Sequence, residues 1–248
     1  MPWSSATCAA FVENPVDKVD NLRNHAGLRL HGPVLGIFAK QPRAGLVKTR
    51  LVPPLTPAEA RDLYRVALAE SVAGFAAGPA TLVLCGSGRS RWFARHFPAL
   101  PFQPQGRGDL GARLQRVVAA LFAAGGGPVA VAGSDSPDLP PALIAAAFAA
   151  LATADVAAIP CRDGGYALLA LRRPAPQLFA AMPWSTDQVL ARTRERAEAL
   201  GLRFASVGAW DDLDDLPALG RLLARSPQCA TARHLRVHLG SRLCAGCG

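Results

Sequence analysis

Short apolar runs alternate with longer segments of mixed polarity along most of the chain. Continuous apolar runs of this kind are typical of strands buried on both faces of a parallel sheet, and the longer segments have the length of helices. Repeated alternation of strand and helix predicts one α/β domain with a mostly parallel central sheet flanked by helices. The pattern predicts strands at 33–39, 80–85, 129–132, 155–160, 166–171 and 202–207, and helices at 57–77, near 91–93, after 109, and at 139–152, 186–200 and 216–224.

The run at 129–132 is the centre of this pattern, because Asp135 and Asp138 follow it directly. In an open α/β sheet, ligands bind beyond the carboxyl ends of the strands, so Asp135 is the first candidate ligand residue. A turn or helix cap before the prolines at 140 and 141 explains an aspartate here about as well, and Asp138 fits that cap better.

A loop with four basic residues follows the first strand. Lys40, Arg43, Lys48 and Arg50 surround Gly45, which lets the backbone approach a ligand closely. Basic groups at the carboxyl end of a strand fit a phosphate-binding loop. The spacing of a P-loop is absent, and a solvated basic loop is the alternative.

Two glycine-containing segments can likewise have either a ligand-binding or a purely structural role. Gly108 and Gly111 precede a helix and can receive a phosphate there, or they belong to a loop that Asp109 caps. The Asp-Gly-Gly link at 163–165 introduces the strand at 166–171 and can be a tight turn, in which case a hairpin makes part of the sheet antiparallel.

Four aspartates between 211 and 215 follow the last strand. Like charges so close together favour a cation among them, or they form a solvated acidic turn before the helix at 216–224. From charge alone, the solvated turn is the better interpretation. Trp184 is either a core residue or an exposed platform, and Ser185 or Thr186 can cap the helix that follows it.

Composition places the 248-residue chain among globular proteins, because 50% of its residues are hydrophobic and 18% are charged. No apolar run reaches the ~18–20 residues of a membrane span, and no secretory signal is recognisable, so a cytoplasmic location is the default expectation. Five of the nine net positive charges lie in 221–248, which carries five Arg and no acid. The modest charge left on the domain suits anionic phosphates, and nucleic acid is not an expected partner.

The six cysteines are too scattered to indicate a disulfide framework, and Cys85 and Cys161 fit core positions. We expect an N-terminal extension at 1–32, the domain at 33–225 and a basic C-terminal tail at 226–248. Within this tail, the stretch 234–247 contains four residues of metal-ligand type in an order that fits no zinc site. They are His234, His238, Cys244 and Cys247.

Six blocks in the same order resemble one family. They are Phe38–Lys40 continuing to Lys48–Leu51, Gly108–Gly111 with Arg113, Gly133-x-Asp135-x-Pro137-x-Leu139, Asp163–Tyr166, Pro183–Thr186 and Asp212–Asp214. In these blocks the chain resembles the bacterial domain-of-unknown-function 2064 (DUF2064) proteins, also known as selenodomain-associated or arsenosugar-type transferase 1. The resemblance implies a single-domain glycosyltransferase-A (GT-A) fold, the arrangement of nucleotide-diphospho-sugar transferases.

The resemblance also implies roles for particular residues. Asp135 matches the superfamily aspartate that holds Mg²⁺ or Mn²⁺, and Asp214 matches the later aspartate that completes the coordination. We therefore expect these two carboxylates roughly 4–6 Å apart, close enough to share one cation. The catalytic candidates are Asp135, Asp163 and Tyr166, and the candidates for binding nucleotide or substrate are Lys40, Arg43, Lys48, Arg50, Gly108, Asp109, Gly111, Gly164, Gly165, Trp184 and Ser185.

These residues predict a metal-dependent glycosyltransferase that uses a nucleotide-diphosphate sugar and a small-molecule acceptor. A glycine-lined gap beside the aromatic rings of Tyr166 and Trp184 suits a sugar ring and favours this function. A guanylyltransferase-like nucleotidyltransferase that takes a nucleoside triphosphate and releases pyrophosphate is one alternative. A nucleotide-binding module without catalysis is the other.

Overall fold

The computed structural model describes residues 29–244, and their side chains as far as residue 239. Most of the expected N-terminal extension, through residue 28, and Cys247 of the expected tail lie outside the described residues. Among the helices between residues 29 and 244, none combines the length and the apolar character that a membrane crossing requires.

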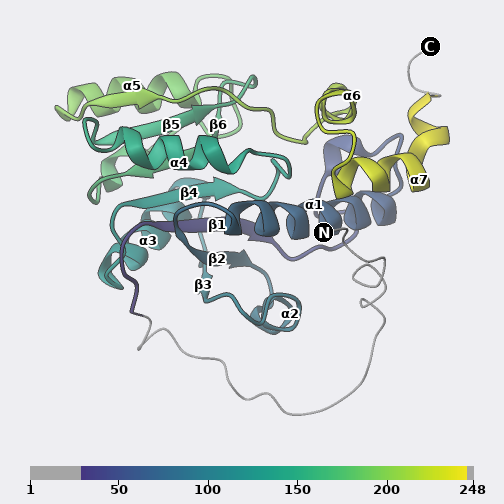
Figure 1. The fold of residues 1–248 in the computed structure, drawn as a ribbon, viewed down its shortest axis with the longest axis horizontal. Coiled ribbons are helices and arrows are strands. Elements are labelled where there is room, and N and C mark those ends of the chain that lie inside the picture. The colour runs from purple at the N-terminus through teal and green to yellow at the C-terminus, as the bar shows by residue number, and fades with distance from the viewer. Residues whose placement is uncertain (1–28, 245–248) are drawn as a thin grey trace.

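A seven-stranded sheet forms the centre of the molecule, in the order β3-β2-β1-β4-β6-β5-β7 (Figure 1). Every neighbouring pair is parallel except those of β6, which runs antiparallel to both β4 and β5. The mostly parallel sheet and the hairpin around 163–165 are thus confirmed. The strands are β1 (Val34–Lys40), β2 (Thr81–Ser87), β3 (Phe102–Pro104), β4 (Val129–Gly133), β5 (Val156–Pro160), β6 (Tyr166–Leu171) and β7 (Phe204–Ser206).

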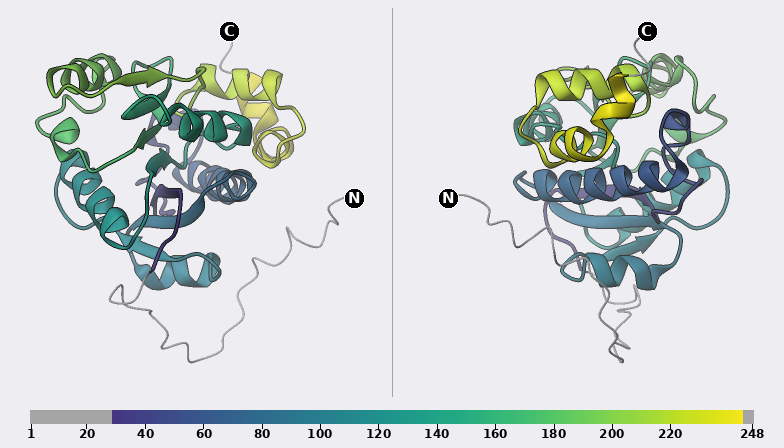
Figure 2. Two further views of the ribbon diagram at one scale, coloured as in Figure 1. Left: turned by 60° about the vertical axis from the view of Figure 1, so that its left-hand side comes forward. Right: turned by 90° about the vertical axis from the view of Figure 1, so that its right-hand side faces the viewer.

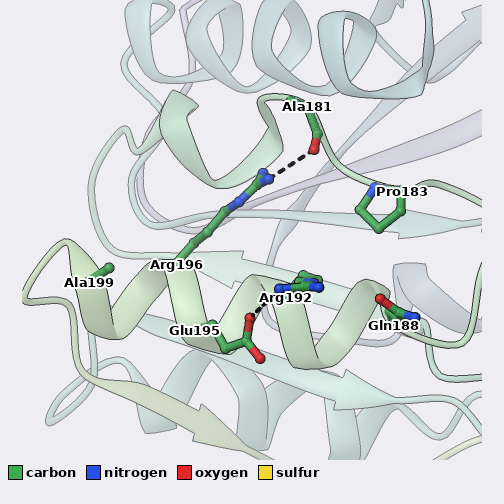
Figure 3. Close-up of a pocket in the computed structure, with 7 residues that line it drawn as sticks. All are labelled: Ala181, Pro183, Gln188, Arg192, Glu195, Arg196 and Ala199. Atoms are coloured by element: carbon green, nitrogen blue, oxygen red, sulfur yellow. Dashed lines mark hydrogen bonds and ion pairs between the residues drawn. The ribbon is translucent and has the colours of Figure 1, made fainter.

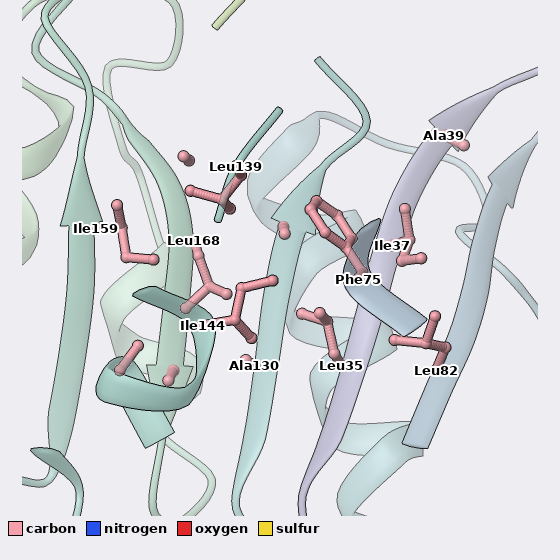
Figure 4. Close-up of a cluster of buried hydrophobic side chains, with 14 of the residues drawn as sticks. Leu35, Ile37, Ala39, Phe75, Leu82, Ala130, Leu139, Ile144, Ile159 and Leu168 are labelled. Carbon is pink, nitrogen blue, oxygen red and sulfur yellow. The ribbon is translucent and has the colours of Figure 1, made fainter. Parts of the chain in front are cut away.

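Helices cover both faces of this sheet, which is why the central strands β1, β4, β5 and β6 are apolar along most of their length. Leu35 and Ile37 of β1 pack under α1 and α4 in the largest core cluster (Figure 4), whereas Val34 packs with α3 on the other face. The helices are α1 (Pro57–Ala76), α2 (Ser90–His96), α3 (Leu110–Ala123), α4 (Pro141–Ala150), α5 (Val189–Ala199), α6 (Leu216–Arg225) and α7 (Ala230–Cys244), with 3-10 turns at Thr49–Leu51 and Pro176–Phe179.

Side-chain caps fix the start of three helices. Thr56 and Glu59 form a capping box at α1, while Asp109 and Asp215 cap α3 and α6 through the backbone amides of Ala112 and Ala218. Two other expectations about caps are wrong. Asp138 does not cap α4, whose N-terminus carries no side-chain cap, and neither Ser185 nor Thr186 caps α5, which begins after Gln188.

The expectation of a basic tail from 226 also needs correction. The segment forms α7, which lies against α1 (Figure 2) and buries Leu235 and Leu239 completely. The Glu70 carboxylate on α1 accepts hydrogen bonds from the Ala230 and Thr231 amides at the start of α7. Apolar packing and this long-range cap therefore make α7 part of the domain.

The N-terminal limit of the domain shifts in the same way. Leu30, expected in the extension, is buried against β1 and α3, and its amide donates to the Ala124 carbonyl oxygen at 2.7 Å. The thiols of Cys85 and Cys161 are buried and unpaired with another sulfur, as the sequence predicts.

Candidate functional site

The carboxyl ends of β1, β4 and β5 lie at one edge of the sheet, and the candidate residues follow these strands. The loop after β1 carries the basic residues of 40–50, the turn after β4 carries Asp135, and the turn after β5 carries Asp163. The segment 210–215, between β7 and α6, reaches the same edge, because the Leu213 amide donates to the Asp135 carbonyl oxygen at 2.7 Å.

The Lys48 ammonium is shared by two aspartates. Its Nζ lies 2.6 Å from Asp135 Oδ1 and 3.0 Å from Asp214 Oδ1. The two Oδ1 atoms are therefore at most about 5.6 Å apart, the sum of these distances, as expected for carboxylates that share one cation.

Local structure directs Lys48 inward. Lys48 has a left-handed backbone (φ 49°) just before the 3-10 turn at 49–51, and the neighbouring Val47 and Leu51 are buried. Its side chain is only 3% exposed. Burial lowers the pKa of the Lys48 ammonium, but Asp135 and Asp214 raise that pKa above its ordinary value, so the group stays charged. Lys48 is thus a buried ion-pair partner rather than a partly exposed loop cation.

Tyr64 on α1 holds the ends of β1 and β4 together beneath this ion pair. Its hydroxyl accepts a hydrogen bond from the Lys40 amide and lies 2.8 Å from Ser134 Oγ. Burial, and then the charge of Asp135, raise the pKa of Tyr64 to about 12, so the hydroxyl stays protonated. Sequence reasoning missed Tyr64, since a tyrosine on the buried face of a helix carries no signal of its position relative to β4.

The four aspartates at 211–215 do not form the solvated acidic turn that charge alone favoured. Asp211 is buried among three arginines, Asp214 binds Lys48, and Asp215 caps α6. Asp212 lines the cavity described below; burial, and then the charges of Asp214 and Asp163, raise its pKa to about 7. Each carboxylate therefore has a different environment.

Asp211 and Asp138 form a second ionic cluster behind the site. Arg225 on α6 donates to both carboxylates, with Nε 2.7 Å from Asp138 Oδ2 and Nη1 3.0 Å from Asp211 Oδ2. The Trp210 indole donates to Asp138 and packs under the Arg225 guanidinium at 4.5 Å. This cluster fixes the segment that carries Asp212 and Asp214.

A cavity of about 220 Å³ opens beside Asp135 at this edge of the sheet. Six of the residues expected from the sequence line it: Asp135, Asp163, Gly165, Tyr166, Trp184 and Ser185. Sequence reasoning gave no site role to the other twelve lining residues, which include Asp212, Ser136, Thr186, Phe38 and Leu110. The Asp212–Asp214 block contained the signal for Asp212, but only Asp214 was assigned from it.

Three aromatic residues, Phe38, Tyr166 and Trp184, line the cavity. Trp184 is half-buried, so its exposure lies between that of a core residue and that of an exposed platform, the two possibilities that the sequence left open. The Tyr166 hydroxyl is buried, and this burial raises its pKa, so it stays protonated. The catalytic role expected for Tyr166 stays a prediction, and its buried hydroxyl does not reach the solvent-exposed surface.

Two of the expected ligand glycines serve packing. Gly164 has φ +83°, and a Cβ there would overlap the Asp187 backbone, so the turn after β5 needs glycine to contact the segment before α5. A Cβ on Gly111 would overlap the Phe179 carbonyl oxygen and meet the Trp184 indole. Gly108 and Asp109 lie at the start of α3, where the Asp109 carboxylate is the helix cap, and neither lines the cavity.

The remaining basic candidates stay on the surface. Lys40 and Arg43 are exposed, and Arg50, with its side chain 62% exposed, lies 3.6 Å from Asp214 Oδ2. None of the three lines the cavity, so they can contact only the part of a ligand that extends outside it.

A larger cavity of about 510 Å³ lies along α5, where Ala181 and Pro183 face the helix (Figure 3). Its acidic residue Glu195 is paired with Arg192, and Arg196 donates to the Ala181 carbonyl oxygen. None of the residues expected as ligands lines this cavity, so the site beside Asp135 is the better candidate.

Asp135 and Asp214 can supply part of a metal coordination sphere. Among residues 29–239, no three His, Cys, Asp or Glu side chains are grouped as metal ligands. Mg²⁺ is commonly held by one or two carboxylates together with substrate phosphates and water, so the pair suffices when a phosphate-bearing substrate is bound. Both carboxylates contact the Lys48 ammonium, so they lie close enough together to share a cation.

Residues 68–186 match the model of a family described as an uncharacterized protein conserved in bacteria, DUF2064. No curated protein matches the sequence of the chain. The structure is similar to that of a candidate nucleotide-diphospho-sugar transferase from Desulfovibrio desulfuricans G20. The TM-score is 0.79 at 28% identity, and the match covers 86% of this chain and 97% of that one.

Two more distant structures share the fold. One is a homologue of Mycobacterium tuberculosis rv0371c from Mycobacterium sp. strain JC1, with a TM-score of 0.52 and 18% identity over 77% of this chain and 95% of that one. The other is CMP:2-keto-3-deoxy-manno-octonic acid synthetase in complex with CTP, with a TM-score of 0.50 and 13% identity over 79% and 98%. The comparisons thus confirm the resemblance: residues 68–186 carry the pattern of the DUF2064 family, and the chain has the nucleotide-diphospho-sugar transferase fold.

Proposed function

We propose that the protein is a metal-dependent glycosyltransferase that transfers a sugar from a nucleotide-diphosphate sugar to a small-molecule acceptor. Its fold and its similarity to the candidate nucleotide-diphospho-sugar transferase from Desulfovibrio desulfuricans G20 support a transferase of the nucleotide-sugar or nucleotidyl kind. The observation that carries the choice of sugar transfer is the cavity beside Asp135, where the rings of Tyr166 and Trp184 meet carboxylates and Gly165.

The cavity has the size of one ring. Its volume of about 220 Å³ is below the ~300–1,000 Å³ of pockets that enclose a whole drug-sized ligand. A sugar ring packs its apolar faces on aromatic side chains, and its hydroxyl groups donate hydrogen bonds to carboxylates. The sugar would therefore occupy the cavity, while the nucleoside diphosphate extends past Asp135 toward Lys40, Arg43 and Arg50.

In the transfer, the acceptor hydroxyl oxygen forms a bond to the anomeric carbon of the sugar, and the bond between that carbon and the diphosphate oxygen breaks. Negative charge then grows on the leaving nucleoside diphosphate. Asp135 and Asp214 would hold Mg²⁺ or Mn²⁺, which when bound neutralises charge on the diphosphate as a Lewis acid. Lys48 keeps both carboxylates directed at one position, and Arg50 adds a positive charge beside Asp214. Asp163 lines the cavity with its Oδ1 held by the Gly165 amide, and it is our candidate to accept the proton of the acceptor hydroxyl.

Product analysis tests this function against nucleotidyl transfer. The purified protein is incubated with Mg²⁺ or Mn²⁺, a panel of nucleotide-diphosphate sugars and a panel of nucleoside triphosphates with sugar phosphates. Release of a nucleoside diphosphate from the first panel, lost in Asp135→Asn, supports sugar transfer. Release of pyrophosphate from the second panel without turnover of the first would assign the site to nucleotidyl transfer. Binding without either product would assign it to a non-catalytic module.

A further inference from the structure

The charged side chains that line the cavity beside Asp135 are all acidic. Three carboxylates line it, those of Asp135, Asp163 and Asp212, and they come from three different loops. Among the residues that the structure describes, no Lys, Arg or His lines this cavity. A ligand group inside it therefore meets negative charge without a compensating cation in the wall.

The cations near the cavity, Lys48 and Arg162, form ion pairs with aspartates. The Lys48 ammonium is divided between Asp135 and Asp214 at 2.6 and 3.0 Å. Arg162 lies next to the cavity residues Cys161 and Asp163 in the chain, but its Nε pairs with Asp211 behind the site at 3.1 Å. A divalent metal ion on Asp135 and Asp214 would be neutralised by the diphosphate of the donor, which leaves the charge of Asp163 facing the ring. Asp212 lies beside it, but burial and then the charges of Asp214 and Asp163 raise its pKa to about 7, so it adds only part of a charge at neutral pH.

The rest of the wall is apolar or neutral. Phe38, Leu114 and Val131 contribute aliphatic and aromatic surface, and Ser136 and Thr186 contribute hydroxyl groups. Carboxylates and hydroxyl groups accept hydrogen bonds from sugar hydroxyls or an ammonium group, whereas like charges in a partly desolvated site repel one another. Such repulsion is an effective way to reject a close analogue of a ligand.

We propose that the cavity receives a neutral or amine-bearing sugar ring and excludes rings that carry a carboxylate or a phosphate. This proposal rests on the proposed function and narrows its donor class to nucleotide-diphosphate hexoses and amino sugars, as opposed to uronic acids. Asp163 enforces the selection, and Asp212 adds to it in its ionised form.

A matched pair of donors tests the effect of charge alone. UDP-glucose carries a neutral hydroxymethyl group at C6 of the sugar, and UDP-glucuronate carries a carboxylate there. Dissociation constants are measured by calorimetry in Mg²⁺ and low salt, where screening is weakest. GDP-mannose and GDP-mannuronate provide the same comparison with another base, and UDP-glucosamine tests the amine. We expect the uronate to bind at least tenfold more weakly than its neutral partner, and UDP-glucosamine to bind at least as tightly as UDP-glucose.

Variants tie the effect to the two aspartates. In the Asp163→Asn/Asp212→Asn double variant, the ratio of uronate to neutral dissociation constants should fall below threefold. The control Asp62→Asn/Glu195→Gln, which removes two carboxylates outside the cavity, should keep the wild-type ratio. Thermal unfolding of all variants shows whether they are folded.

The outcomes separate this proposal from the proposed function. Equal affinity for both members of a pair, or a ratio unchanged in the cavity variant, overturns the charge selection while sugar-nucleotide binding stands. If the protein binds nucleoside triphosphates but none of the nucleotide sugars, the proposed function fails and the selection fails with it.

Discussion

Lys48 and Asp214 are 166 positions apart in the chain, yet Lys48 Nζ lies 3.0 Å from Asp214 Oδ1. Asp135 completes the contact from a third part of the chain, at 2.6 Å. The loop after β1, the turn after β4 and the segment before α6 are thus joined by one buried ammonium group. Loss of this ammonium group should therefore lower the stability of the protein and increase the stabilisation that Mg²⁺ provides.

Lys48→Met should destabilise the protein by about 1–2 kcal/mol. Removal of one partner from a buried ion pair costs about 3–5 kcal/mol, and the partial exposure of Asp135 and Asp214 reduces that cost here. Urea unfolding measures the change in free energy, and Mg²⁺ should restore more stability in this variant than in the wild type, since it can replace the lost cation. Arg43→Met is the matched control, because Arg43 is an exposed cation of the same loop. Equal stability of the two variants would contradict the role of Lys48.

Leu235→Ala in α7 should cost about 2–4 kcal/mol, because the side chain is fully buried against α1 and α6 and its removal leaves a cavity. Val237→Ala, two positions away with the side chain 75% exposed, should stay within about 0.5 kcal/mol of the wild type. Urea unfolding midpoints of the two variants test whether α7 belongs to the domain. A Leu235→Ala protein as stable as Val237→Ala would show that the segment is a dispensable tail.

Helix α7 illustrates what the sequence did and did not reveal. Ala232, Leu235 and Leu239 have the spacing of a buried helix face, which is the signal in the sequence that predicts α7. The Glu70 cap could not have been found, because it joins α1 to residues about 160 positions later in the chain. Local patterns predict elements and caps such as Thr56, whereas contacts between distant elements require the fold.

The same distinction holds for the site. The position of Asp135 beyond a buried strand follows from the strand pattern, and the block at 212–214 pointed to Asp214. Charge alone gave the wrong environment for 211–215, because the partners of these aspartates are Lys48, Arg225 and the start of α6, which only the fold brings near. Sequence likewise could not show that Lys48 is buried, since its exposure depends on two carboxylates from other loops.

Asp138→Asn should destabilise the protein by about 2–3 kcal/mol at pH 7, because it removes the charge that pairs with Arg225 at a buried position. Burial raises the pKa of Asp138, but hydrogen bonds from Arg225, Ser226 and Trp210 lower that pKa by more, so it lies below the ordinary value. The stabilisation is therefore complete above the unfolded-state pKa of about 4 and is lost as the pH falls through the lower folded-state pKa. The difference in unfolding free energy between wild type and variant should shrink below pH 4. A difference independent of pH would show that the Asp138 charge is not responsible.

Trp184→Ala should weaken binding of a nucleotide-diphosphate sugar about tenfold and leave binding of the free nucleoside diphosphate unchanged. Trp184 lines the cavity that we propose for the sugar, and the same proposal puts the nucleotide outside that cavity. Calorimetric titration with both ligands gives the two affinities, and Trp184→Phe should retain most of the sugar contribution. An equal loss for both ligands would place Trp184 against the nucleotide instead.

The central claim is that Asp135 and Asp214 bind a divalent metal ion together with the diphosphate of a sugar nucleotide. Calorimetric titration of the wild-type protein with a nucleotide-diphosphate sugar, in Mg²⁺ and again in a chelator, tests it most directly. We predict at least a tenfold gain in affinity in Mg²⁺, which Asp135→Asn and Asp214→Asn abolish and Asp187→Asn, an exposed carboxylate that lines neither cavity, retains. The same affinity with and without metal, or a metal-dependent gain that survives in Asp135→Asn, would contradict the claim.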